Sequence, residues 1–347
     1  MNTALPIIEC VPNFSEGRDE KIIAAIADAI KAIHHVHLLH IDASPAANRT
    51  VMTFAGAPEA VVEAAFRAIK TAAELIDMKK QEGVHPRIGA TDVCPLVPLY
   101  NINRDEVITL SKQLGKRVGE ELNIPVYLYE HSAKESYRKP LPNIRKGQYE
   151  GMKEKMKEQK WKPDYGPAIL NENTGATVIG ARDILVAFNI ALQTKDVSIA
   201  HAIARQIRES GYIHIENGMK TRIEGLLPKL RAIGWYMKDY ELAQVSFNLL
   251  DYRMTSPLKV WQTCERLARE WDVELVGSEV IGLIPEECLL EAGRFAVKNK
   301  KNNSENSPEQ LVQQAIELLG LNKLKPFDPQ EKVLEYALAQ TGILNSF

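Results

Sequence analysis

Apolar residues in the first hundred positions form short continuous runs, separated by stretches with helical spacing. The runs that predict β-strands lie at residues 5–11, 36–41, 50–55 and 93–99. After the first run, Ile22, Ile26 and Ile30 recur at the spacing of one helix face. A second helix is expected from Pro58 to about Ile76, because proline suits the first turn of a helix. The order predicted for this part of the chain is βαββαβ.

The second half of the chain repeats that order. Strands are predicted at 184–192, 232–237, 242–250 and 273–276, and helices at 197–209 and 257–271. This is the order of the ferredoxin-like split βαβ motif. We therefore expect an α/β (α+β) fold of two ferredoxin-like βαββαβ subdomains, with helices outside and the free faces of the sheets facing each other. The N-terminal subdomain is expected at 1–180, the C-terminal subdomain at 181–330 and a C-terminal tail at 331–347.

Charge and composition narrow the functional classes. The 347 residues include 43 Lys and Arg against 45 Asp and Glu, and this net charge of −2 argues against nucleic-acid binding, which needs a basic excess. No apolar stretch approaches the roughly 20 residues of a membrane-spanning helix, and residues 1–10 do not resemble a secretory signal. The four cysteines form no C-x-x-C pair, which predicts reduced thiols in the cytoplasm and no metal site.

One segment between the two halves differs in composition. Residues 130–164 contain ten Lys or Arg and six Asp or Glu, an excess of four positive charges. Two interpretations stay open for it: a solvated, partly helical connector, or a surface that attracts an anionic ligand. Further along the chain, residues 299–307 contain few apolar side chains and are expected to form a mobile loop between two helices.

Common nucleotide and hydrolase motifs do not occur in the sequence. There is no G-x-G-x-x-G for a dinucleotide and no G-x-S-x-G nucleophile elbow. Residues 175–180 have the glycine spacing of a phosphate-binding loop, but Ala181 and Arg182 follow where Lys and Ser or Thr are needed. Nucleotide binding is therefore not supported.

Four histidines cluster between residues 34 and 40. In a strand, His35 and His37 would share one face while His40 would point away from them. Asp42 is the only carboxylate nearby. Convergent metal ligands are therefore not expected, and solvated histidines are the simpler interpretation.

His85 lies in a loop bounded by Gly83 and Gly89. The following residue, Pro86, favours an extended backbone at His85, which restricts the direction of its side chain. A histidine with an ordinary pKa of about 6.5 can both accept and donate a proton at neutral pH. The loop alone leaves open a catalytic histidine and a histidine bonded to the backbone.

Other polar residues at predicted strand ends could bind a substrate. Arg49 and Arg87 could each hold a carboxylate through paired hydrogen bonds, the alternative being surface ion pairs. Asp42 and Asn48 lie in the same predicted connection as Arg49. In the second half, five polar residues within apolar strand patterns require either an internal network or a ligand: Arg182, Asn189, Gln244, Asn248 and Asp251.

Several longer motifs resemble those of the glutamate formimidoyltransferase family. They occur at residues 9–17 (ECVPNFSEG), 48–51 (NRTV), 85–95 (HPRIGATDVCP), 125–129 (PVYLY), 175–182 (GATVIGAR), 187–190 (AFNI), 234–236 (GWY) and 244–246 (QVS). The resemblance extends from Glu9 to about Tyr336, nearly the whole chain. It implies two subdomains whose sheets face each other around a folate-binding groove, assembled as a homodimer.

The resemblance also implies an activity. Members of this family transfer the formimidoyl group from N-formimidoyl-L-glutamate to N5 of the co-substrate tetrahydrofolate, giving 5-formimidoyltetrahydrofolate and L-glutamate, in histidine degradation. Their catalytic histidine corresponds to His85. In animals the domain is fused to a cyclodeaminase, so a separate cyclodeaminase is expected to take the product here. Their folate-binding segment, whose interior differs in this chain from the animal form, corresponds to Gly166, Pro167, Ala168, Ile169, Leu170, Asn171, Glu172, Asn173, Thr174 and Gly175.

This reaction suggests roles for the neighbouring residues. His85 is expected to act first as the base at N5 and then as the acid for the leaving glutamate nitrogen. Asp42 would stabilise positive charge on the formimidoyl group, and Arg49 and Arg87 would hold the substrate carboxylates. Formyl transfer to or from folate and a non-catalytic folate or amino-acid sensor stay open as alternatives.

Overall fold

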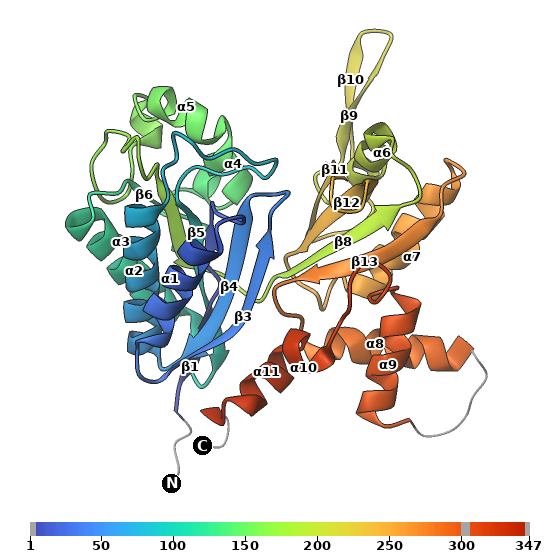
Figure 1. The fold of residues 1–347 in the computed structure, drawn as a ribbon. Helices are drawn as coiled ribbons and strands as arrows, with labels where there is room; N and C mark the ends of the chain where they lie inside the picture. Colours follow the sequence, from blue (N-terminus) through green and yellow to red (C-terminus); the bar gives the residue numbers. More distant parts are fainter. Residues whose placement is uncertain (1–4, 300–305, 344–347) are drawn as a thin grey trace. The chain divides into compact units, whose positions relative to one another are not determined.

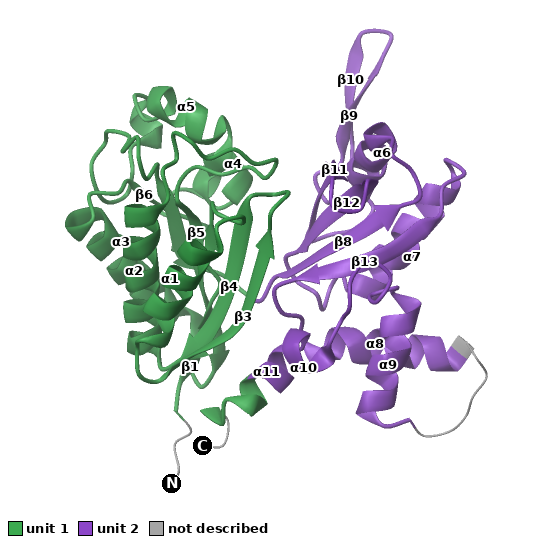
Figure 2. Ribbon diagram, viewed as in Figure 1, with its two compact units in different colours: residues 1–183, 338–347 green, residues 184–337 purple. Residues whose placement is uncertain are grey.

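The chain divides into two units between Asp183 and Ile184. Unit 1 is formed by Met1–Asp183 and Leu338–Phe347, and unit 2 by Ile184–Ala337 (Figure 2). The computed structural model describes residues 5–299 and 306–343, so most of the predicted loop at 299–307 lies outside the described residues. Each unit has its own sheet and its own apolar core.

The sheet of unit 1 contains the strands of the predicted βαββαβ order. They are β1 (Ile7–Cys10), β2 (Asn13–Phe14), β3 (Val36–Ser44), β4 (Arg49–Gly56) and β5 (Thr91–Tyr100). β1 and β2 are two pieces of one interrupted strand that pairs antiparallel with β4 on one side and β5 on the other, and β3 pairs with the outer edge of β4. The resulting order, β3–β4–β1/β2–β5, confirms the ferredoxin-like arrangement.

Unit 1 also has an extension that the apolar pattern did not indicate. Beyond β5 the sheet continues through β7 and then β6, and β7 is parallel to both of its neighbours. The P-loop-like stretch at 175–180 is thus mostly a buried strand. Fully buried parallel strands lack the polar alternation of an exposed strand, which explains why this one was missed. The added elements are α3 (Arg104–Glu121), β6 (Val126–Leu128) and β7 (Thr177–Ala181).

Three helices cover one face of the unit 1 sheet: α1 (Glu20–Lys31), α2 (Pro58–Leu75) and α3. Each begins with a local signal, since Asp19 caps α1, Pro58 occupies the first turn of α2, and Asn103 forms a capping box with Glu106 at α3. Their apolar faces pack on the strands in one core, and Figure 1 shows the three helices on the same side of the sheet.

The basic segment 130–164 covers the opposite face of the same sheet at β5, β6 and β7. Its buried side chains Ile144, Met152 and Met156 share an apolar cluster with Tyr127 of β6. The segment is therefore not a solvated connector, and the expectation of helices on one face only is wrong for unit 1. Its elements are η1 (Glu130–Ser132), η2 (Ser136–Arg138), α4 (Leu141–Arg145), α5 (Gln148–Lys155) and η3 (Gln159–Trp161).

β3 is longer than predicted and is irregular. It continues through Asp42, which the sequence pattern placed in the following loop. A bulge at Leu39 shifts its register. His37 pairs with Ala55 of β4, and His40 pairs with Thr53, two residues from Ala55. His37, His40 and Asp42 therefore share one face of the sheet, and the expectation that His40 points away from His37 is wrong.

The core of unit 2 repeats the strand order of unit 1. Its four strands pair antiparallel in the order β11–β12–β8–β13. Helices α6 and α7 pack on the apolar face of this sheet. The second ferredoxin-like motif is thereby confirmed, with the elements β8 (Val186–Leu192), α6 (Val197–Ile207), β11 (Leu230–Met237), β12 (Leu242–Leu249), α7 (Pro257–Arg269) and β13 (Leu275–Ile281).

Unit 2 carries two additions. A hairpin of β9 (Tyr212–Glu216) and β10 (Met219–Ile223) is inserted between α6 and β11, where no strand was predicted. In the described part of the chain four helices follow β13, the last of which ends in the unit 1 residues after Ala337, and part of the range predicted as a C-terminal tail is helical. These helices are α8 (Glu286–Asn299), α9 (Pro308–Leu318), α10 (Pro329–Lys332) and α11 (Leu334–Gln340).

Candidate functional site

The loop that carries His85 connects α2 to β5 and lies against the segment 166–175. The backbone N–H of Met78 donates to the carbonyl of Asn173, and the N–H of Ala90 donates to the carbonyl of Thr174, each at 2.8 Å. Two stretches that are distant in the sequence therefore form one surface. Sequence reasoning identified both stretches but could not show that they touch.

Both glycines that bound this segment are required by geometry. Gly166 and Gly175 have φ angles of +78° and +69°, which side chains disfavour. A Cβ atom at Gly175 would lie 2.3 Å from the carbonyl oxygen of Ile88 in the His85 loop. The close contact between the two stretches thus depends on glycine, while Ile169 between them is 78% exposed.

A buried carboxylate lies beside this loop, at the start of β5. Asp92 is fully buried and accepts from the backbone N–H of Ile88 at 3.1 Å. It also pairs with two guanidinium groups: Arg49 Nη1 lies 2.8 Å from its Oδ2, and Arg145 contacts both of its oxygens. Burial alone would raise the pKa of Asp92, but the charges of Arg145 and Arg49 hold it below its ordinary value.

Arg49 is held in place at the first position of β4. Its Nε and Nη2 donate to Oδ1 of Asn13 at 3.0 and 2.8 Å. Burial, followed by the nearby charge of Arg145, lowers the pKa of Arg49 to about 10, so it stays charged at neutral pH. Three of its N–H groups face Asn13 and Asp92, and the other two have no acceptor among residues 5–299 and 306–343.

Arg145 is the functional candidate that sequence reasoning missed. It is the last residue of α4, and its side chain is 15% exposed. Nothing in the sequence distinguishes Arg145 from the other nine Lys and Arg residues of segment 130–164. Only the packing of α4 brings its side chain to Asp92. Two arginines and one carboxylate leave the cluster with one positive charge, which favours an anionic ligand.

His85 is half-buried and lies within the electrostatic field of this cluster. Burial, and then the positive charges of Arg49 and Arg145, lower the pKa of His85 well below its ordinary value. Its Nδ1 lies 2.8 Å from the carbonyl oxygen of Pro86. A carbonyl only accepts, so Nδ1 carries the proton in this contact and the neutral ring has its lone pair on Nε2.

Arg87 has a different role from the one the sequence suggested. It donates to the side-chain and main-chain oxygens of Gln81, to Gln148 and to both carboxylate oxygens of Glu150, at 2.6 to 3.3 Å. These contacts use all five of its N–H groups. Arg87 therefore joins the His85 loop to α5 and has no donor left for a substrate carboxylate in this structure.

Asp42 lies on the same sheet face as Arg49. It pairs with Val51 of β4, two residues from Arg49, and its side chain is only 9% exposed. Nε2 of His40 lies 3.7 Å from its Oδ2. Among the described residues no group of three or more His, Cys, Asp and Glu side chains could hold a metal ion.

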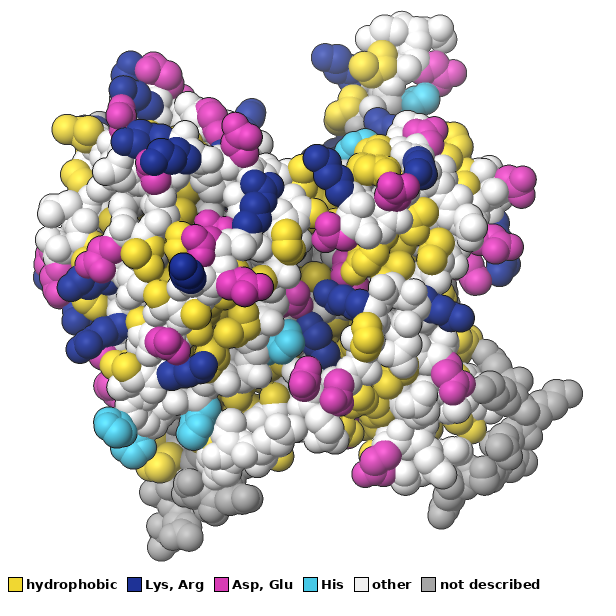
Figure 3. Space-filling model, viewed as in Figure 1, with side chains coloured by type: hydrophobic (Ala, Val, Ile, Leu, Met, Phe, Trp, Pro, Cys, Tyr) yellow, Lys and Arg dark blue, Asp and Glu magenta, His cyan; other side chains and the backbone are white. Residues whose placement is uncertain are grey.

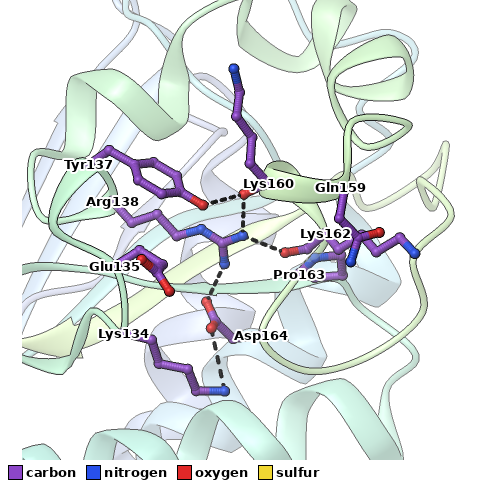
Figure 4. Close-up of a pocket in the computed structure, with 9 residues that line it drawn as sticks. All are labelled: Lys134, Glu135, Tyr137, Arg138, Gln159, Lys160, Lys162, Pro163 and Asp164. Atoms are coloured by element: carbon purple, nitrogen blue, oxygen red, sulfur yellow. Dashed lines mark hydrogen bonds and ion pairs between the residues drawn. The ribbon is translucent and has the colours of Figure 1, made fainter.

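The basic segment also lines a separate pocket of about 330 Å³ (Figure 4). Arg138 crosses this pocket and donates to Asp164 and to the carbonyl oxygens of Lys160 and Lys162 at 2.6 to 2.9 Å. These hydrogen bonds hold η2 against η3 and the residues that follow it. The lining includes none of the residues around His85.

Two family models match the chain. A model described as "Formiminotransferase domain, N-terminal subdomain" matches residues 7–182, and one described as "Formiminotransferase domain" matches residues 187–339.

No helix in the described parts of the chain is long and apolar enough to cross a membrane.

Relatives resemble the chain over most of its length. A glutamate formimidoyltransferase of Streptococcus pyogenes serotype M1 is 42% identical, with 83% of this chain and 92% of that protein covered. A glutamate formimidoyltransferase of Thermoplasma acidophilum is 39% identical, with 90% and 100% covered. A formimidoyltransferase-cyclodeaminase of Dictyostelium discoideum is 45% identical over 96% of this chain, which spans only 60% of that protein.

Proposed function

Because the chain belongs to the formiminotransferase family, we propose that it transfers the formimidoyl group from N-formimidoyl-L-glutamate to N5 of tetrahydrofolate, giving 5-formimidoyltetrahydrofolate and L-glutamate, in histidine degradation. The observation that carries this proposal is a neutral His85 beside a buried cluster with one net positive charge. Tetrahydrofolate is the acceptor co-substrate, and no step requires a metal.

His85 acts as a proton carrier in this proposal. Its Nε2 lone pair takes the proton from N5 as N5 bonds to the formimidoyl carbon. When the bond from that carbon to the glutamate nitrogen breaks, Nε2 of His85 donates the proton to the glutamate nitrogen as it leaves. The depressed pKa suits this cycle, because the resting ring is neutral at physiological pH and is a ready proton donor once protonated.

The glutamate end of the donor binds to Arg49 and Arg145. Both carry charge at the edge of the buried cluster, and Arg49 has two N–H groups left for a carboxylate. This assignment replaces Arg87 with Arg145, since Arg87 is saturated by protein acceptors. Holding the donor carboxylate fixes the reacting carbon close to N5, which is an effect of positioning.

Tetrahydrofolate binds along the segment 166–175 in this proposal. The segment borders the His85 loop and exposes Ile169, so an aromatic ring system would find an apolar partner there. We further propose that the protein is cytoplasmic, because its four thiols are buried and unpaired, and that it forms a homodimer.

A formyl donor is the second candidate, and Asp42 distinguishes the two. A formimidoyl group is basic and carries positive charge when protonated, whereas a formyl group is neutral. The mostly buried carboxylate of Asp42, on the face shared with Arg49, favours the cationic group.

Purified protein incubated with tetrahydrofolate and either N-formimidoyl- or N-formyl-L-glutamate tests the proposal, with the folate product identified by absorbance and mass. We expect turnover with the formimidoyl donor and its loss in His85→Ala. Folate binding without transfer from either donor would instead favour a sensor.

A further inference from the structure

The hairpin of β9 and β10 extends from unit 2 as an isolated two-stranded ribbon (Figure 1). Nine of its ten strand residues are exposed. Figure 3 shows apolar side chains on the part of the surface that lies over this hairpin. The exposed large apolar residues of the hairpin are Ile213 (56% exposed), Ile215 (62%), Met219 (72%) and Ile223 (37%). A two-stranded hairpin with so little burial is marginally stable in water, which implies a partner.

The register of the hairpin shows which backbone groups a partner would meet. Asn217 and Gly218 form a two-residue turn with φ angles of +50° and +79°, and Glu216 pairs with Met219 across it. In a hairpin with a two-residue turn, the two residues that flank the turn form hydrogen bonds with each other. Beyond them, non-hydrogen-bonded and hydrogen-bonded pairs alternate along the two strands. The N–H and C=O groups of Ile213 and Ile215 therefore point away from β10, along an edge with which no other described strand pairs.

We propose that this edge of β9 pairs antiparallel with β9 of a second copy of the chain, about a two-fold axis at His214. In this register Ile213 lies opposite the partner's Ile215, and Tyr212 lies opposite the partner's Glu216. All five residues of β9 are then paired, and the outward groups of Ile213 and Ile215 form four hydrogen bonds across the axis. The four isoleucines join on one face of a four-stranded sheet.

Charge selects β9 over the other edge of the hairpin. A two-fold pairing of β10 about Thr221 would place Lys220 opposite the partner's Arg222, and like charges directly opposite each other are destabilising. Lysine on an edge strand also resists pairing in general. β9 has neither Lys nor Arg, and its apolar residues fall at the outward-pointing positions.

A cysteine at the axis tests the register directly. Residues that face each other at the axis have Cα atoms about 4.5 Å apart, within the range of a disulfide. In the full chain, His214→Cys should therefore form a disulfide-linked dimer on mild oxidation. Thr221→Cys is the matched control, since it shares the same hairpin face but lies about 14 Å from its copy, three strand spacings away. The native cysteines are buried and should add little background.

Sedimentation of the full chain provides the second measurement. Ile215→Lys should raise the dissociation constant of the dimer by about tenfold or more, because each dimer loses two apolar cross-strand pairs and gains two charges. Thr221→Lys should leave it nearly unchanged, and an unaltered melting temperature would show that both variants fold. A monomeric wild-type protein, or a dimer that Ile215→Lys does not weaken and His214→Cys does not cross-link, would overturn the proposal. Both readouts are molecular masses, so their outcome is independent of any transferase assay.

Discussion

Asp92 in unit 1 and Glu279 in unit 2 lie on equivalent strands, the last of each βαββαβ set. Both carboxylates are buried, with 0% and 4% of each residue exposed. Asp92 is held by two arginines. Glu279 instead accepts from two amides and a phenol and pairs with one ammonium group, namely Asn189 at 3.2 Å, Gln244 at 3.0 Å, Tyr240 at 3.0 Å and Lys325 at 3.3 Å.

The two carboxylates differ in the charge that remains around them. Glu279 and Lys325 cancel, and the indole N–H of Trp235 extends the network by donating to Gln244 at 2.9 Å. The cluster around Asp92 keeps one positive charge and unused N–H groups beside His85. A buried carboxylate is therefore not itself the sign of a ligand site, whereas an uncompensated charge beside a titratable group is.

The largest expected effect separates the chemistry of the two units. His85→Ala should lower kcat by about 10²–10⁴-fold, the usual range for loss of a general acid–base. The Kd for folate should change little, because the lost group acts on proton transfer. Single-turnover rates measure the first quantity and equilibrium titration the second. His201→Ala, on the exposed side of α6 in unit 2, is the matched control and should retain the wild-type rate.

Removing each buried carboxylate tests the comparison at the level of stability. Asp92→Asn leaves two buried arginines without a counter-charge and should cost about 3–5 kcal/mol. Glu279→Gln keeps a hydrogen-bonding side chain beside a lysine that is 37% exposed, and should cost about 1–2 kcal/mol. Hydrogen exchange of peptides from β5 and β13 measures the two effects separately. Equal costs would show that the arginines around Asp92 are better solvated than their burial indicates.

The same carboxylate predicts how stability depends on pH. The pKa of Asp92 is depressed in the folded chain, so its stabilising contribution is complete above the unfolded value of about 3.9. That contribution is lost as the pH falls through the folded pKa. Asp92→Asn should therefore lose less stability than the wild type between neutral and strongly acidic pH.

Two arginines of unit 1 distinguish binding from architecture. Arg49→Lys should raise the KM for the donor by about tenfold with little change in kcat, because lysine keeps the charge but loses the paired donors. Arg87→Lys should lower the melting temperature more than it changes any KM, since all five N–H groups of Arg87 bind protein. A raised KM for the donor with an unchanged melting temperature in Arg87→Lys would instead show that Arg87 binds the substrate.

The smallest expected effect is a shift in the pH profile. The lowered pKa of His85 predicts an acidic limb of kcat/KM below pH 6.5, because only the neutral ring accepts the proton of N5. The negative charge of Asp92 raises the pKa of His85, so its removal in Asp92→Asn should move the limb to lower pH. Glu279→Gln should leave the limb in place.

Local signals in the sequence were enough for the two βαββαβ sets, and a local motif also led to the prediction for His85. Helical spacing, Pro58 at a helix start and continuous apolar strands are properties of neighbouring residues, and they placed most elements within a few positions. The motif around His85 is equally local. The hairpin of β9 and β10 was missed because its isoleucines pack on no core, so its pattern could not be told from that of a loop.

What joins distant residues was decided only by the tertiary structure. Arg145 reaches Asp92 because α4 packs on a second face of the sheet, and a bulge at Leu39 brings His40 to the face of Asp42. Arg87 was predicted to hold a substrate carboxylate, but in the structure two of its N–H groups donate to the carboxylate of Glu150. A side chain has the same donors in any sequence, but which acceptors come within about 3 Å of them depends on how the elements pack.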